Sequence, residues 1–327
     1  MNPHPGTLRH WLITFAAVFA AGTGGILLPR FGAQVPLPLL PSGIAVAAYF
    51  RWGRGMWPAV FVAAICTDLW IVKTPIQALS VTAGATASAA LTAWILEWRG
   101  FDANFSRARD VPLFIFAAAL GMAVTPTAGL LGRLLAGQGM FADPLRWVLW
   151  WSNDTVGVML VGPMLVAVSR RSFAQFAQHW AAGALWLMSL AIFCVAVFTL
   201  GSASVGRPLV GVLSMLLIVI GAIRFGLVVT AFGALIMSTT VAFSFVFGRG
   251  VYGQFDELTG LAMVWSVSAV GAILNLTIIA LLAERDSAGQ ERLRAERRYA
   301  QVFDGSPQPL WVHDRNTDEF LLVNEAT

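Results

Sequence analysis

The stretch WWSNDTVGVMLVGP, residues 150–163, sets one carboxylate, Asp154, inside a segment apolar enough to cross a lipid bilayer. A carboxylate at the centre of a bilayer costs about 2.5–3.5 kcal/mol on insertion scales. A membrane protein retains such a residue where a partner, a polar cavity or a ligand compensates the charge. The stretch therefore predicts a membrane-embedded helix with a polar site at Asp154.

The composition of the whole chain supports a membrane protein. Of the 327 residues, 57% are hydrophobic and only 12% are charged, whereas soluble chains carry about 25% charged residues. The net charge of +4 is typical of loops that face anionic lipid. No basic run is interleaved with aromatic residues, so nucleic acid is not an expected partner. We expect an all-α polytopic membrane helix bundle.

Apolar runs broken by charges, Pro or Gly predict about 8–10 transmembrane helices, since a span needs about 20 residues. The second and eighth runs are short and interrupted by prolines, so each is a full span, a half-span or a re-entrant segment. The ten ranges are 11–29, 36–50, 56–73, 75–96, 111–132, 145–169, 180–199, 208–222, 225–247 and 259–283.

The distribution of basic residues predicts the orientation, because cytoplasmic loops are enriched in Arg and Lys. With both termini in the cytoplasm, the inner loops receive Arg9, Arg51, Arg54, Arg99, Arg107, Arg109, Arg170, Arg171 and Arg224. The outer loops receive the shorter set Arg30, Lys73, Arg133, Arg146, Arg207 and Arg249. The bias favours an even number of spans.

Three local patterns give further expectations. Small residues between Ala83 and Ala90 predict that the fourth span is buried in the bundle. Thr125-Pro126-Thr127 predicts a kink whose freed carbonyl groups the threonine hydroxyls satisfy. Cys66 and Cys194 both lie in apolar segments and are interpreted as small buried hydrophobes, with no disulfide framework.

The composition changes after Leu282. Residues 1–283 form the membrane bundle, residues 284–300 a charged cytoplasmic signalling helix, and residues 301–327 the start of another domain. In that last part, 309–312 and 320–323 are predicted strands with a turn at 314–317. Two strands cannot form a core, so the tail is interpreted as a fragment of a longer domain.

Several short motifs follow one another along residues 10–280. They are Pro41-Ser42-Gly43, Trp57-Pro58, Gly100-Phe101-Asp102, Arg109-Asp110-Val111, Gly157, Pro163 and Arg224-Phe225-Gly226. In the order and spacing of these motifs the chain resembles a bacterial membrane-associated sensor family (MASE, type one). It departs from the family pattern at Leu40 before Pro41 and at Thr67-Asp68, where an Asn is expected.

The tail resembles the start of a PAS domain, at Ser306-Pro307, Trp311-Val312 and Val323-Asn324-Glu325-Ala326. The two resemblances imply a sensory input module in the bacterial inner membrane, acting as a homodimer. They also imply a downstream output: a histidine kinase of a two-component system, or a cyclic-di-GMP enzyme. The ligand is a small molecule or a membrane protein partner.

Asp154 and Asn153 are the leading candidates for a ligand or cavity site. The structural alternative is an Asp154 satisfied by an Arg or by Trp N–H groups. For Asp68, an interfacial contact with Lys73 is favoured over a ligand role. Arg133 is either a counter-charge to Asp154 or an outer-interface residue. Trp150 and Trp151 either stack on a ligand or serve packing, which is commoner for Trp.

No catalytic, metal or cofactor motif is visible in the sequence. The histidines His4, His10, His179 and His313 do not pair with Cys, Asp or Glu at metal-ligand spacing, and no phosphate-binding loop is present. An enzyme is therefore not expected within this stretch. The alternative to a sensor is a small-molecule transporter with Asp154 in the substrate or proton path.

Overall fold

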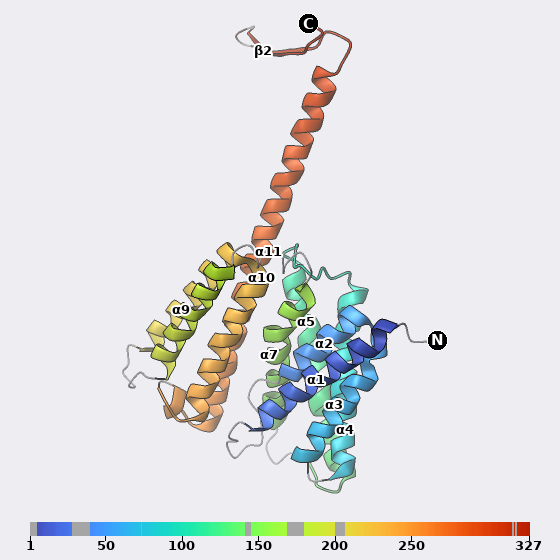
Figure 1. Cartoon of the computed structure of the whole chain (residues 1–327), viewed down its shortest axis with the longest axis vertical. Helices are drawn as coiled ribbons and strands as arrows, with labels where there is room; N and C mark the ends of the chain where they lie inside the picture. Colours follow the sequence, from blue (N-terminus) through green and yellow to red (C-terminus); the bar gives the residue numbers. More distant parts are fainter. Residues whose placement is uncertain are drawn as a thin grey trace. The chain divides into compact units, whose positions relative to one another are not determined.

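The computed structural model describes residues 5–27, 40–72, 74–140, 145–168, 180–199, 207–250, 252–315, 317 and 319–327. The described chain is predominantly helical, as predicted, with one small two-stranded sheet (Figure 1). It divides into two compact units, Met1–Ala280 and Leu281–Thr327. The α-helices are α1 (Pro5–Leu27), α2 (Leu40–Trp52), α3 (Trp57–Ile71), α4 (Pro75–Trp98), α5 (Asp110–Met122), α6 (Val124–Leu135), α7 (Leu145–Ala167), α9 (Trp180–Phe198), α10 (Arg207–Val246) and α11 (Glu257–Asp304), with short 3₁₀ helices η1 (Arg54–Met56) and η2 (Tyr252–Gln254).

Proline and glycine determine where two of the long helices break. Pro126 has no backbone N–H, and its ring clashes with the carbonyl of the residue four positions earlier, Met122. The chain accordingly separates α5 from α6 at Ala123, and the hydroxyl of Thr127 donates to the Ala123 carbonyl at 2.7 Å. The predicted break at this point is confirmed, but the hydroxyl of Thr127 bonds the Ala123 carbonyl and not the Met122 carbonyl that Pro126 frees. In α10, Gly226 has φ 75° and ψ −175°, a conformation that favours glycine, and it separates the eighth and ninth predicted spans.

The helix α4 lies at the centre of the first seven helices and contacts α2, α3, α5 and α6. Its small residues allow this close packing, and Gly84 faces Ala128 of α6 so closely that an added Cβ would lie 2.5 Å from the Ala128 Cβ. Ser88 and Ala89 are each only 1% exposed. The prediction of burial is confirmed for one face of this segment, whereas Ala83 and Ala87 on the other face are exposed.

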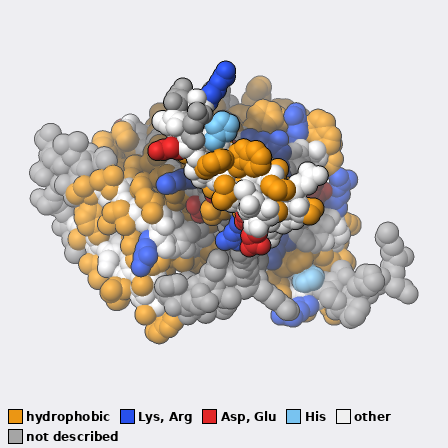
Figure 2. Space-filling model, turned by 90° about the horizontal axis from the view of Figure 1, so that it is seen from above, with side chains coloured by type: hydrophobic (Ala, Val, Ile, Leu, Met, Phe, Trp, Pro, Cys, Tyr) orange, Lys and Arg blue, Asp and Glu red, His pale blue; other side chains and the backbone are white. Residues whose placement is uncertain are grey.

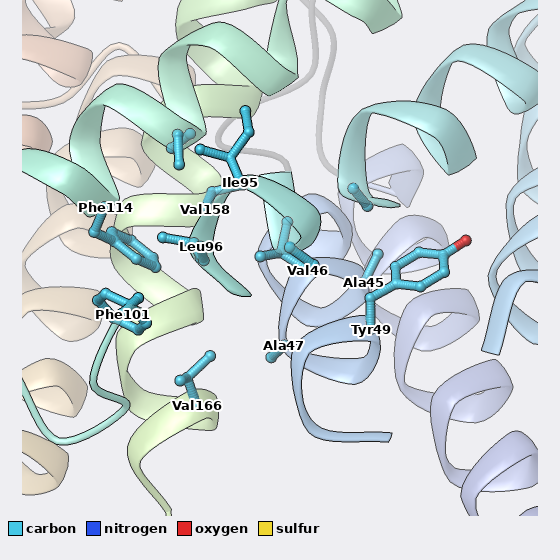
Figure 3. Close-up of a cluster of buried hydrophobic side chains, with 14 of the residues drawn as sticks. Ala45, Val46, Ala47, Tyr49, Ile95, Leu96, Phe101, Phe114, Val158 and Val166 are labelled. Atoms are coloured by element: carbon cyan, nitrogen blue, oxygen red, sulfur yellow. The ribbon is translucent and has the colours of Figure 1, made fainter. Parts of the chain in front are cut away.

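Two apolar cores hold the first unit together. The first core joins α2, α4, α5 and α7, and Figure 3 shows part of it, with Tyr49, Leu96, Phe101, Phe114 and Val158. The second core joins α7 to α9, α10 and the first part of α11, through Leu190, Phe198, Ile218, Met237 and Val264 among others. Cys194 lies buried in the second core, as expected, whereas Cys66 is exposed. The expectation of a buried Cys66 was wrong because that residue lies on the outward face of α3.

The surface of the first unit is largely apolar. Hydrophobic side chains cover much of the visible surface, with scattered charged side chains between them (Figure 2). On α9, Leu185, Met188 and Ile192 are more than half exposed. Lipid tails are the solvent that makes such exposure favourable, and a helix that is hydrophobic all round is expected in a membrane.

Five helical segments of the described chain are long and apolar enough to cross a membrane. The helices α2 and α3 have only 13 and 15 residues, fewer than the 20 or so that a full span needs. The number of crossings, eight to ten, therefore stays a prediction. The five segments are Pro75–Trp98, Asp110–Leu135, Trp180–Phe198, Leu213–Val246 and Leu258–Asp304.

The second unit comprises the last part of α11 and a β-hairpin. Strands β1 (Trp311–His313) and β2 (Phe320–Val323) pair antiparallel, with Trp311 opposite Val323. Both form close to the predicted strand ranges. Asn324 ties the hairpin to the chain before it: its side-chain amide donates to the carbonyls of Phe303, Ser306 and Gln308, and its Oδ1 accepts from the Leu310 N–H at 2.9 Å.

Candidate functional site

Asp154 lies in the middle of α7 and is only 2% exposed. Its Oδ1 accepts a hydrogen bond of 2.8 Å from the hydroxyl of Ser42, which lies in the first turn of α2. Its Oδ2 is buried and has no hydrogen-bond partner among the described residues. The carboxylate also forms no salt bridge with a described side chain, so one of its two oxygens is without a donor among the described residues.

The close approach of α2 to α7 brings Ser42 to Asp154. A Cβ added at Gly43 would lie 2.7 Å from the carbonyl oxygen of Gly157 and 2.9 Å from the Cβ of Val161. Only a glycine fits a contact that tight. At the other end of α2, Nη1 of Arg51 donates to the carbonyls of Leu165 at 2.7 Å and Val168 at 2.5 Å. The two helices are therefore joined at both ends.

A second carboxylate, Asp68, lies near the end of α3. Its Oδ2 accepts a hydrogen bond of 2.6 Å from the hydroxyl of Thr82 on α4. Asp68 is an electrostatic neighbour of the Asp154 carboxylate, and the hydroxyl of Thr125 on α6 lies within hydrogen-bonding reach of that carboxylate. In the structure Thr125 donates its proton to the hydroxyl of Ser88, at 3.0 Å. We call these six side chains the hydroxyl–carboxylate cluster: Ser42, Asp68, Thr82, Ser88, Thr125 and Asp154.

The remaining predicted site residues fall outside this cluster or pack beside it. The indole of Trp150 covers Gly129, where an added Cβ would lie 2.7 Å from the ring. Trp151 donates to the carbonyl of Ala119 at 2.6 Å. Both indoles thus pack between helices, the alternative that the sequence favoured. Arg133 donates to the Gln138 carbonyl at 3.5 Å and is not among the neighbours of Asp154. Asn153 is fully buried.

The positions predicted from the family motif lie at helix starts and helix contacts. Pro41 lies in the first turn of α2, and Trp57 and Pro58 begin α3, where a proline needs no N–H partner. Pro163 lies inside α7. The Lys73 contact expected for Asp68 involves a residue outside the described ranges.

Sequence reasoning found the two acids but missed their hydroxyl partners as site residues. Ser42 was noted only beside Pro41 and Gly43, and Thr125 only as part of a kink. Serines and threonines are common in membrane helices, where they often bond their own backbone four residues earlier, so their identity alone carries little signal. A useful signal is a hydroxyl beside a glycine at a predicted helix contact, as at Ser42-Gly43.

The donor set defines what the cluster can do. It consists of carboxylate and hydroxyl oxygens from α2, α3, α4, α6 and α7, and it contains no thiol or imidazole. Among the residues that the structure describes, no group of three or more His, Cys, Asp or Glu side chains is placed to hold a metal ion. The set suits binding and rearrangement rather than covalent or redox chemistry. Together with the apolar surface, it defines a multi-pass membrane protein with a buried polar centre.

The comparison with known families agrees with that class. A family model, MASE1, matches residues 6–286, and the chain therefore belongs to the MASE1 family of membrane-associated sensor domains. These are sensory input domains without catalytic activity of their own. No curated protein and no solved structure matches the chain.

Proposed function

We propose that this chain is the sensory input region of a bacterial inner-membrane signalling protein, and that α11 carries its state to a cytoplasmic output. The observation behind the proposal is that α11 is one helix from Glu257 to Asp304. It includes the apolar segment that begins at Leu258 and the charged segment from Glu284 to Arg298. A rotation or shift at one end of a continuous helix is transmitted along the helix to its other end.

In this proposal both termini are cytoplasmic, which follows the excess of basic residues in the inner loops. Ser42 near the start of α2 and Asp68 near the end of α3 then belong to the outer half of the membrane. A ligand that arrives from outside the cell then has a shorter path to the cluster than a ligand that arrives from the cytoplasm. Occupancy must favour one packing of the helices over another, since a ligand with equal affinity for both transmits nothing.

The residues after α11 are proposed to begin a PAS domain, in front of a histidine kinase or a cyclic-di-GMP enzyme. The antiparallel pairing of β1 and β2 and the bonds that Asn324 makes to the preceding chain support a domain start in this place. The proposal includes a homodimer, because outputs of these kinds act in pairs.

An insertion series tests the relay. Residues 1–327 are fused to a diguanylate cyclase domain, and one to seven alanines are inserted after Gly289, within the exposed part of α11. Each residue of an α-helix adds about 100°, so seven residues return nearly to the starting phase. We expect cyclic-di-GMP output to change most with one, two, five and six alanines, to return partly with four, and to come closest to the parent level with seven.

If cyclic-di-GMP output falls steadily with the number of inserted alanines, or does not change at all, it does not depend on helical phase, and the relay is contradicted. The same insertions placed after Thr317, within the hairpin loop, serve as the matched control for a mere change in length. The transporter alternative makes a different prediction: vesicles containing the chain take up a solute, and Asp154→Asn abolishes that uptake.

A further inference from the structure

The charge balance of the hydroxyl–carboxylate cluster is incomplete within the protein. Asp154 and Asp68 are electrostatic neighbours, and neither forms a salt bridge with a described side chain. Two like charges in an apolar surrounding repel each other strongly, and an unpaired buried charge costs several kcal/mol. Among the described residues, the cluster therefore has no positive charge to balance its two carboxylates.

The protein already stabilises part of the negative charge. Ser42 donates to Asp154, and Thr82 donates to Asp68. Ser42 also lies in the first turn of α2, and the N-terminus of a helix carries a partial positive charge. These contacts account for one oxygen of each carboxylate. They leave Oδ2 of Asp154 buried and without a donor among the described residues.

That free oxygen belongs to a side chain that is 2% exposed. It lies in a group whose other members are carboxylate and hydroxyl oxygens. Hard cations prefer such oxygen ligands, whereas soft metals need thiolates or imidazoles. Divalent cations usually draw on more carboxylates or retain several waters, and no larger acidic or histidine group is present among the described residues.

We propose that the hydroxyl–carboxylate cluster between α2, α3, α4, α6 and α7 binds a small monovalent cation, with Oδ2 of Asp154 as a direct ligand. The bound cation offsets the repulsion between Asp154 and Asp68 and draws α3 toward α7. This inference rests on the proposed sensory function. In it, binding of the cation is the state that the helix bundle transmits to the output.

Thermal unfolding of the purified chain in nanodiscs tests the site without any output domain. The Tm is followed by tryptophan fluorescence at pH 8, while sodium chloride replaces choline chloride at constant total salt. A specific site gives a saturable rise in Tm of several degrees, because a ligand that binds only the folded state stabilises it. Asp154→Asn keeps an acceptor for Ser42 and should abolish the rise.

Two further variants keep the test decisive if Asp154→Asn fails to fold. Ser42→Ala retains both carboxylates and should shift the sodium midpoint about tenfold lower, since a carboxylate that has lost a strong hydrogen-bond donor gains more from a bound cation. Ser189→Ala removes an exposed hydroxyl of α9 that bonds only its own helix, at Leu185, and should leave the midpoint unchanged.

Several outcomes overturn the proposal. Equal effects of sodium and choline mean that no specific site exists. A sodium effect that survives in Asp154→Asn places the site elsewhere. A Tm that rises on acidification to pH 6 in every salt, with no sodium effect, means that a proton fills the role. A response to calcium alone excludes a monovalent site. None of these results bears on the insertion series, so failure of the cation site and failure of the relay are distinguishable.

Discussion

The two apolar cores of the membrane unit differ in what they enclose. The first seven helices surround buried carboxylates and several hydroxyls, and α2 meets α7 through a backbone contact at Gly43. The helices α9, α10 and α11 enclose neutral groups, such as the Ser238–Ser268 pair at 2.6 Å. Gly221 and Gly260 face the rings of Trp186 and Phe245, whereas Gly271 faces the flexible end of Met237. One region is built to hold charge, and the other is neutral and packs through side chains.

The largest expected effect tests the rigid contact. Gly43→Ala brings a Cβ against the backbone carbonyl of Gly157, which cannot move without displacing α7, and should destabilise the protein by about 2–3 kcal/mol. Gly24→Ala in α1, where nothing lies within 4 Å, is the matched control and should be neutral or slightly stabilising. Reversible unfolding in mixed detergent and SDS, followed by circular dichroism, measures both. Equal stabilities would mean that α2 and α7 do not meet this closely.

The next largest effect compares a charged with a neutral hydrogen bond. Ser42→Ala leaves Oδ1 of Asp154 without its donor and should cost about 2 kcal/mol, because bonds to charged groups contribute about 1.5–3 kcal/mol. Ser268→Ala in the second region removes a bond between two hydroxyls and should cost about 1 kcal/mol. The same unfolding assay compares them. A larger loss of stability for Ser268→Ala than for Ser42→Ala would contradict the assignment of the charged hydrogen bond to the first region.

A smaller effect tests the adaptable region. A Cβ added at Gly271 of α11 would lie 2.5 Å from Cε of Met237. That atom is the end of a flexible thioether chain, which can move aside. We expect Gly271→Ala to change stability by less than about 1 kcal/mol, since the gain in helix propensity offsets the shift. A loss as large as that of Gly43→Ala would show that both regions are equally rigid.

The smallest effect concerns acid sensitivity at one loop of each region. Desolvation alone would raise the pKa of Asp102, in the loop before α5, but hydrogen bonds from Asn104 and Ser106 lower it. Hydrogen bonds from Thr259 lower the pKa of Asp256, which precedes α11. A lowered pKa gives stability that is present above the ordinary value of 3.8 and is lost as pH falls through the folded value.

We therefore expect Tm to fall below about pH 4, and Asp102→Asn to flatten that fall more than Asp256→Asn, because Asp256 is exposed to solvent screening. Titration of Tm between pH 6 and pH 3 measures the difference. An identical acid profile in the parent and in Asp102→Asn would contradict it.

Sequence reasoning reached the fold class because composition and helix breaks are local properties. Pro126 and Gly226 act on their own neighbours, so the break before α6 and the break within α10 were foreseeable. The buried acid Asp154 was foreseeable because its cost in lipid does not depend on the fold. The pairing of Asp154 with Ser42 was not, because it joins residues 112 positions apart through a helix contact that no local pattern specifies. The exposure of Cys66 was missed for the same reason.

The double attachment of α2 to α7 constrains how the bundle can move. Ser42 and Arg51 hold the two helices at points nine residues apart along α2, about 13.5 Å at 1.5 Å per residue. Sliding of one helix along the other would break both attachments at once. The two helices thus move as one rigid body, and a response involves the helices around them, such as α3, the contact of α7 with α10 and the break of α10 at Gly226.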